Sequence, residues 1–176
     1  MRLFIAAPVA SSRAFSLATQ SLQKTTSGVQ LVPDDSWHIT LRFLGEVDDL
    51  HLVAAAMHDA LAGFAAIPAV VRGVGAFPKP CAARVAWAAV DAPGLARVAE
   101  RICAATANMG NPPGTSSFAP HVTLARLKHA CDLTRWIEQH KSTLFFQGDL
   151  NQIALFSSKQ SNEGPVYNWE AVVKLG

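Results

Sequence analysis

The sequence is poor in cysteine and has no long apolar run, and each shortage excludes a class of protein. Its three cysteines, Cys81, Cys103 and Cys131, lie far apart, so they indicate neither a disulfide framework nor a paired-cysteine metal site. No apolar stretch approaches the roughly 20 residues that a membrane-spanning helix needs. We therefore expect a soluble protein of a reducing compartment, the cytoplasm, with no membrane partner.

Charge of either sign is also scarce. Charged residues make up 16% of the chain, the formal net charge is +2, and there is no basic run. A protein that wraps a long nucleic acid neutralises many phosphates and shows a basic surface. If the ligand is a nucleic acid, the sequence favours a strand terminus or a short fragment over a duplex.

What the chain has in plenty is apolar residues, arranged in one order of elements that occurs twice. Half of its 176 residues are hydrophobic, which predicts a packed core. The repeated order is a strand, a helix, a strand that contains a histidine, and a helix. The first copy occupies residues 2–8, 11–25, 36–45 and 46–63, and the second occupies residues 84–90, 91–110, 118–127 and 132–141.

The spacing inside the two copies agrees closely. Arg2 precedes His38 by 36 residues, and Arg84 precedes His121 by 37. A further strand over residues 68–77 follows the first copy, and two strands within 144–158 and 164–175 end the chain. We expect one domain over residues 1–176 with two internal halves, about 1–78 and 79–176. Packed about an approximate two-fold axis, the halves would bring the two histidines together.

Each copy carries the same short motif in its histidine-containing strand. The first lies in "WHITLRFLG" and the second in "PHVTLARLK". Side chains alternate along a strand, so the histidine and threonine of each motif point to one side and the apolar residues to the other. We therefore expect His38, Thr40, His121 and Thr123 to line a cleft.

Two facing histidines can share the proton transfers of phosphoryl or acyl transfer. A neutral imidazole can accept a proton from the attacking water, while a protonated one gives a proton to the leaving oxygen. An unperturbed histidine pKa near 6.5 makes both forms accessible at neutral pH. Threonine hydroxyls and an arginine would hold the non-bridging oxygens of a phosphate.

Strand alternation by itself does not place the arginine of the second motif in the cleft. On a regular strand Arg126 would share a side with Val122 and Leu124, away from the cleft, unless a bulge re-aims it. Arg42 has the parity of the cleft side but belongs to the other half. By the same count Phe43 belongs to the core, whereas Tyr167, near the end of the chain, can reach the cleft.

Plainer interpretations stand beside the catalytic one. A single histidine and threonine on a strand is more often structural, and only the second copy in a matching context favours catalysis. A duplication that carries no chemistry remains open. A metal site is disfavoured, because two imidazoles without a nearby Cys or carboxylate pattern fall short of the usual three or four ligands. We expect no metal and no cofactor.

The repeated motifs and the segments around them resemble a known family. The segments are "RLFIAA", "WHITLRFLGEV", "FPKPCAARVAWAAV", "FAPHVTLARL" and "LFSSKQSNEGPVY". They resemble the two-histidine phosphoesterase superfamily, in particular its LigT-like RNA 2′,3′-cyclic phosphodiesterases (ThpR), also called 2′-5′ RNA ligases. The resemblance covers nearly the whole chain, in the order of the family.

The resemblance implies a fold, an activity and a site. The fold would be a bilobal α+β architecture, with two antiparallel sheets lining a central cleft and helices outside. The activity would be opening of a ribose 2′,3′-cyclic phosphate to a 2′-phosphate without a metal. By likeness, the catalytic pair would be His38 as the acid and His121 as the base, and the phosphate ligands would be Thr40, Thr123 and Arg126.

The resemblance is weakest in the last loop, and this leaves the substrate open. There "SSKQSNEGPVY" carries Lys159 and Glu163 where a more apolar, Gly-rich segment is expected. The expected partners are RNA 3′ ends or nucleotides with a 2′,3′-cyclic phosphate, bound by a monomer. Two other functions stay open: a module that binds RNA-end phosphate without cleaving it, and a ligase that forms 2′-5′ bonds by the reverse reaction.

Overall fold

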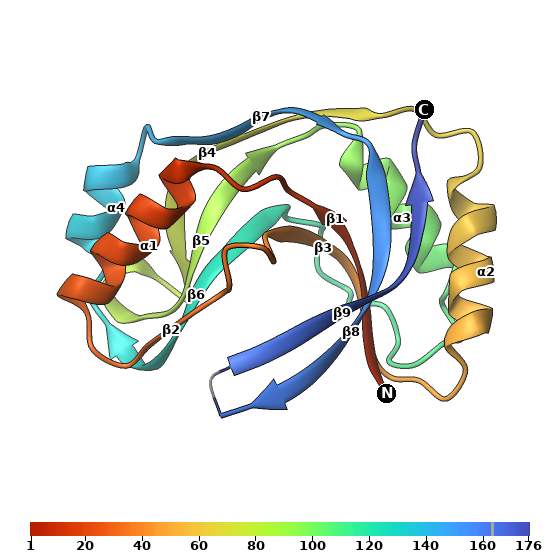
Figure 1. Ribbon diagram of the computed structural model, residues 1–176, viewed down its shortest axis with the longest axis horizontal. Helices are drawn as coiled ribbons and strands as arrows, with labels where there is room; N and C mark the ends of the chain where they lie inside the picture. The colour runs from red at the N-terminus through yellow and green to blue at the C-terminus, as the bar shows by residue number, and fades with distance from the viewer. Residues whose placement is uncertain (163) are drawn as a thin grey trace.

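One curled antiparallel sheet dominates the computed structural model, which describes residues 1–162 and 164–176 (Figure 1). Its strands are β1 (Arg2–Pro8), β2 (Val29–Leu31), β3 (His38–Glu46), β4 (Ile67–Phe77), β5 (Ala83–Asp91), β6 (His121–Cys131), β7 (Leu144–Leu150), β8 (Gln152–Ser161) and β9 (Gly164–Lys174). The helices are α1 (Arg13–Thr25), α2 (Leu50–Leu61), α3 (Leu95–Ala105) and α4 (Thr134–His140), with a short 3₁₀ helix at Pro80–Ala82. The fold is α+β.

The expectation of two separate sheets is wrong. The strands run in the order β7-β4-β5-β6-β3-β1-β8-β9, and β2 pairs with β6. The two central strands, β3 and β6, are paired at Ile39 and Val122. Because this joint is so short, the strands on its two sides can turn relative to each other, and the sheet curls while remaining continuous.

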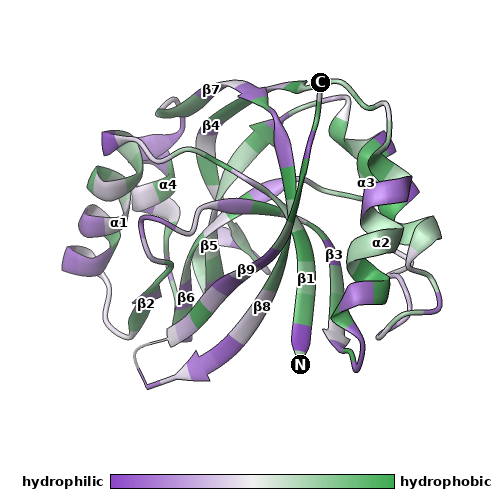
Figure 2. Cartoon of the chain, turned by 45° about the vertical axis from the view of Figure 1, so that its right-hand side comes forward, coloured by the Kyte–Doolittle hydropathy of each residue, from purple (hydrophilic) through white to green (hydrophobic). Residues whose placement is uncertain are grey.

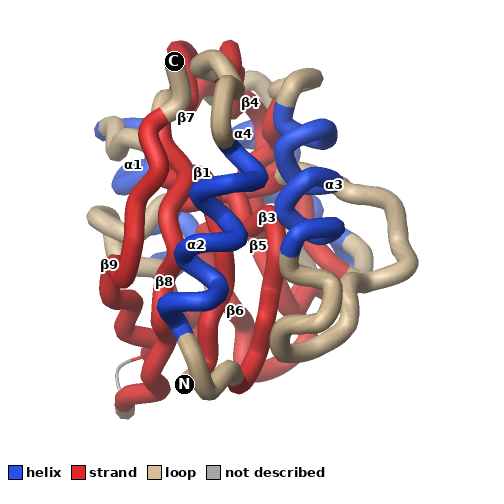
Figure 3. Tube along the Cα trace, turned by 90° about the vertical axis from the view of Figure 1, so that its right-hand side faces the viewer, coloured by secondary structure: helices blue, strands red, loops and turns tan. Residues whose placement is uncertain are grey.

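The helices lie outside the sheet in two pairs. Helices α1 and α4 pack together beside β2, β4, β6 and β7 (Figure 1). Helices α2 and α3 pack together beside β3 and β9 (Figures 1 and 3). Helix α1 therefore comes from the first half of the sequence but covers strands of the second, and α3 does the reverse. Among the described residues, no helix is long and apolar enough to cross a membrane.

Helix α1 illustrates how the apolar pattern of a helix fixes its place. Its buried residues, Phe15, Ala18, Thr19 and Leu22, recur at helical spacing on one side. The Phe15 ring stacks on Trp37, with centroids 4.8 Å apart. Full burial of side chains of this size stabilises the fold by about 2 kcal/mol each. Figure 2 shows the polar residues of this helix on its outer side. The packing also fixes Trp37, the residue before His38.

Several element boundaries differ from the sequence expectation. Helix α3 begins at Leu95 and not at Asp91, because Asp91 is the last residue of β5. The helix ends at Ala105, before the expected stop at Gly110. The cap of α2 is Asp49, whose side chain accepts hydrogen bonds from the backbone N–H groups of His51 and Leu52.

The end of the chain holds three strands where two were expected. Asn151 interrupts the predicted strand over residues 144–158 and separates β7 from β8. Strand β7 pairs with β4, and β8 pairs with β1, so the chain crosses from one edge region of the sheet to the other. The hairpin of β8 and β9 then brings Tyr167 over β1 and β3. The short strand β2 was not expected at all.

Candidate functional site

The two motifs meet at the joint of the sheet. Ile39 and Val122, the paired residues, each lie between the histidine and the threonine of their own motif. In an antiparallel pair, the neighbours of two paired residues are also opposite each other and share the other side of the sheet. Each histidine is therefore placed beside the threonine of the other motif: His38 beside Thr123, and His121 beside Thr40.

A β-bulge in β6 brings Arg126 to the same side as the motif. Trp87 pairs with Thr123 and Ala86 with Ala125, so β6 has one residue more than β5 in this interval. Leu124 and Ala125 are consequently both buried, and Arg126 is exposed. The extra residue reverses the parity of all positions after it. On a regular strand Arg126 would point away from the cleft. The bulge turns its side chain to the side of His121 and Thr123.

The same bulge occurs in β3, where it reverses two expectations. Ala6 pairs with Thr40 and Ile5 with Arg42, so the extra residue is Leu41. Arg42, expected to face the cleft, is 4% exposed, and Phe43, expected in the core, is 44% exposed. Phe43 follows His38 by five residues, as Arg126 follows His121. If the two copies are aligned on their histidines, Phe43 matches Arg126, and this match could have predicted that Phe43 is exposed.

Arg42 holds the segment that leads to His121. Its guanidinium donates to the carbonyl groups of Phe43 at 3.1 Å and Met109 at 3.4 Å, and also to that of Asn111. The approach is close: a Cβ atom on Gly110, whose φ is +63°, would lie 2.1 Å from the carbonyl oxygen of Leu44. The guanidinium of Arg42 is therefore committed to holding this loop, and Arg42 does not line the hollow that contains His38, Thr123 and Arg126.

The two histidine rings are held in the same way. Nδ1 of His38 lies 2.7 Å from the carbonyl oxygen of Ser36, and Nδ1 of His121 lies 2.8 Å from that of Ala119. A carbonyl oxygen only accepts, so in each ring Nδ1 carries a proton and donates it. Nε2 of each neutral ring is then the nitrogen available to accept a proton.

Aromatic side chains surround His38. Its ring centroid lies 5.0 Å from that of Phe4, 5.9 Å from that of Phe156 and 5.3 Å from that of Tyr167. Burial lowers the pKa of His38, the backbone carbonyl of Ser36 opposes this shift, and nearby His121 and Arg126 lower the pKa further. These surroundings favour the neutral form of His38.

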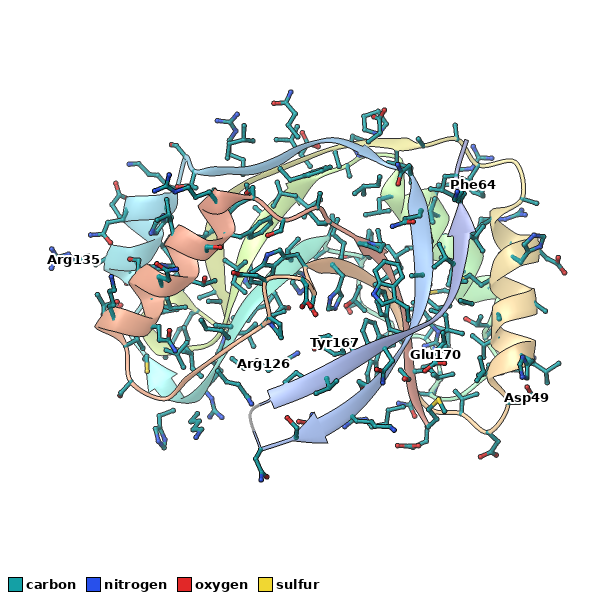
Figure 4. The ribbon with its side chains drawn as sticks, in the orientation of Figure 1. Asp49, Phe64, Arg126, Arg135, Tyr167 and Glu170 are labelled. Carbon is teal, nitrogen blue, oxygen red and sulfur yellow. The ribbon has the colours of Figure 1, made fainter. Side chains whose placement is uncertain are left out.

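A hollow of about 440 Å³ connects most of the predicted site residues. It is lined by four of the five, His38, Thr40, Thr123 and Arg126, together with Tyr167 and Phe43. The fifth, His121, lines an adjoining hollow that shares Thr40 and Phe43 with the first. Figure 4 shows Arg126 and Tyr167 on the side of the sheet enclosed by the β8–β9 hairpin.

Arg126 influences the groups around it. Burial raises the pKa of Tyr167, and the charge of Arg126 opposes that shift. The same charge acts on His38. The arginine that the bulge re-aims is therefore electrostatically coupled to both rings. In the described part of the chain, no three His, Cys, Asp or Glu side chains are grouped as metal ligands.

The last loop lies close to this hollow. Ser158 and Gln160 line it, and Lys159, between them on β8, does not. Glu163, the other residue by which this loop differs from the expected pattern, lies outside the described residues. Of the two residues, Lys159 is thus located on β8 between two residues that line the hollow.

Comparison with known proteins identifies the family. Residues 8–162 match the 2′-5′ RNA ligase superfamily. The chain is 34% identical over 154 residues to the RNA 2′,3′-cyclic phosphodiesterase of Aeropyrum pernix, covering 84% of this chain and 86% of that protein. The RNA 2′,3′-cyclic phosphodiesterase of Thermus thermophilus is 31% identical over 177 residues, covering 95% of this chain and 86% of that protein.

Solved structures agree in fold. The crystal structure of TT0787 of Thermus thermophilus has a TM-score of 0.83 at 31% identity and covers 99% of this chain and 98% of its own. E. coli LigT, crystallised with 3′-AMP, has a TM-score of 0.75 at 20% identity and covers 99% of this chain and 97% of its own. From its sequence match and its fold together, the chain belongs to the 2′-5′ RNA ligase superfamily.

Proposed function

We propose that the chain is an RNA 2′,3′-cyclic phosphodiesterase, which opens the cyclic phosphate of an RNA end or nucleotide to leave a 2′-phosphate. The observation that carries the proposal is the equivalence of the two histidines, one on each side of the Ile39–Val122 pair and each held through Nδ1 by a carbonyl two residues earlier. The relatives at 34% and 31% identity are both named RNA 2′,3′-cyclic phosphodiesterase.

The reaction needs two proton transfers on opposite sides of one phosphorus atom. One Nε2 accepts a proton from water as the water oxygen forms a bond to phosphorus. The bond from phosphorus to the 3′-oxygen breaks, and the other imidazolium gives its proton to that oxygen. The products are a 2′-phosphate and a 3′-hydroxyl group. The second imidazole ends neutral and the first protonated, and exchange with water restores both.

Three further side chains suit the phosphate that lies between the rings. Thr40 and Thr123 come from different strands, and each lies beside the histidine of the other motif, so their hydroxyl groups can donate to the two non-bridging oxygens. Arg126, on the same side after the bulge, adds a positive charge for the negative charge that develops on those oxygens. The proposal uses no metal and no cofactor.

We assign His121 as the base and His38 as the acid. Burial lowers the pKa of His38, so the acid role requires a bound anion that restores the proton to its ring. A bound cyclic phosphate is an anion, and its charge favours the protonated ring against the effect of burial. The equivalence of the two histidine motifs also supports a duplicated architecture, with an approximate two-fold axis through the joint of β3 and β6.

A sulfur leaving group tests the assignment. A thiolate needs far less protonation than an alkoxide, so a substrate with sulfur in place of the 3′-oxygen no longer depends on the acid. We expect the activity of His38→Ala to recover by at least about tenfold relative to wild type on this substrate, and that of His121→Ala not to recover. Recovery in His121→Ala alone would exchange the two roles. Single-turnover rates on the oxygen and sulfur substrates give both comparisons.

Product analysis tests the function itself and separates it from the two alternatives. Incubation with adenosine 2′,3′-cyclic phosphate, followed by phosphorus NMR, should give the 2′-phosphate alone, with the same rate in EDTA. Tight binding without any product would favour a phosphate-binding module. A ligase would join cyclic-phosphate and 5′-hydroxyl RNA ends, and because water is in great excess we expect joining only at high concentrations of ends.

Size-exclusion chromatography with light scattering tests the proposed monomer.

A further inference from the structure

Arg2, the first residue of β1, reaches the same hollow as the proposed catalytic groups. It lines the hollow together with Arg126 and His38. Its guanidinium carbon lies 5.6 Å from the ring centroid of Phe43. Phe43 occupies in β3 the position that Arg126 occupies in β6, so the first motif has no arginine at this position. Arg2, which lies over the Phe43 ring, supplies a positive charge there.

Among residues 1–162 and 164–176, no carboxylate forms an ion pair with Arg2. Glu46 lies opposite Arg2 in the ladder of β1 and β3, but its carboxylate accepts from the N-terminal ammonium at 2.8 Å. Throughout the described residues, neither Arg2 nor Arg126 forms an ion pair with a carboxylate. The described residues that line the hollow include no Asp or Glu: Arg2, Phe4, Gln30, Val32, His38, Thr40, Phe43, Thr123, Arg126, Ser158, Gln160, Pro165 and Tyr167.

The hollow on the other side of His38 has the opposite character. Three carboxylates, Asp34, Asp35 and Asp149, line it together with the half-exposed ring of Trp169, and its lining includes no Lys or Arg. A phosphate there would lie among the three carboxylates, whereas a phosphate near Arg2 meets a guanidinium that forms no ion pair with a described carboxylate. The difference in charge between the two hollows thus favours the side of β1 for a second phosphate.

We propose that Arg2 binds a second phosphate of the substrate, the 5′-phosphate of the same nucleoside whose 2′,3′-cyclic phosphate lies between the histidines. This inference rests on the proposed function and narrows its substrate class. In an RNA chain the 5′-phosphate is the diester to the preceding nucleotide. The site then prefers RNA 3′ ends and oligonucleotides to nucleoside cyclic phosphates that carry no other phosphate. Arg126 serves the cyclic phosphate, and Arg2 serves the next phosphate along the chain.

Two substrates that differ by one phosphate test the proposal. They are adenosine 2′,3′-cyclic phosphate and the same compound with a 5′-phosphate. We expect the wild type to show a kcat/KM about tenfold higher on the 5′-phosphorylated substrate, the order that a charge-assisted hydrogen bond to phosphate contributes. This preference should weaken as salt is added, because the contact is exposed to solvent. In Arg2→Gln the ratio should fall toward one.

Variants of other arginines control for net charge and folding. Arg2→Lys keeps the charge without the planar fork and should keep part of the preference. Arg13→Gln removes an exposed arginine on α1, outside the hollow, and should keep the full ratio. Equal kcat/KM on the two substrates, or a preference that survives in Arg2→Gln, would overturn the inference while leaving the proposed function intact. Hydrolysis of neither substrate would instead overturn the proposed function, and the inference with it.

Discussion

Alanine in place of His38 or of His121 is expected to lower kcat on a 2′,3′-cyclic nucleotide by about 10²–10⁴-fold, the usual contribution of a general acid or base. Each ring is one of the two proton-transfer groups, and each is fixed through Nδ1 by its own backbone carbonyl. Neither alanine leaves a buried hydrogen-bond donor without a partner, so the fold should persist. Steady-state kinetics on both variants measure the effect.

The double variant separates a shared role from two independent ones. If the rings act on one phosphorus atom, His38→Ala with His121→Ala should be little slower than either single variant, because groups that act as a unit are not additive. His51→Ala, which removes an exposed histidine of α2, should keep wild-type activity. A single variant with activity close to wild type, and with a native circular dichroism spectrum, would contradict the catalytic assignment.

Alanine in place of Arg42 is expected to lower the free energy of unfolding by about 3 kcal/mol, because several carbonyl groups lose the one buried donor that they share. The guanidinium donates to the carbonyl groups of Phe43, Met109 and Asn111, and it is 4% exposed. Urea denaturation should show a lower midpoint. The segment that leads to His121 should also become more accessible to proteolysis.

Arg101→Ala is the matched control for Arg42→Ala. Arg101 is exposed on α3, so its loss should change the free energy of unfolding by less than about 0.5 kcal/mol. An unchanged urea midpoint in Arg42→Ala would show that water replaces the guanidinium at no cost. In that case the burial of Arg42 would not explain how the loop before His121 is held.

The repeat in the sequence was sufficient to predict that the two motifs meet. Matching the copies placed the histidines at equivalent positions, and the alternation of strand side chains placed each threonine on the side of its histidine. The structure has this arrangement about the pair of Ile39 and Val122. These features depend on local pattern and on chain connectivity, and both can be read from the sequence.

The errors come from features that local pattern does not encode. A β-bulge depends on the partner strand, and alternation alone assigned Arg42 and Phe43 to the wrong sides. Arg42 is buried because carbonyl groups from a distant loop satisfy it, which becomes visible only after the chain has folded. The continuous sheet and the crossing at Asn151 likewise depend on which strands become neighbours, and strand propensity does not fix that choice.

A crystal structure of the protein with bound adenosine 2′-phosphate would show whether both histidines reach one phosphate. We expect one phosphate with oxygens within hydrogen-bond distance of Nε2 of both His38 and His121, and with Arg126 beside it. If the phosphate contacts only one of the two rings, with the other Nε2 too far away to reach it, the two histidines do not form one catalytic pair.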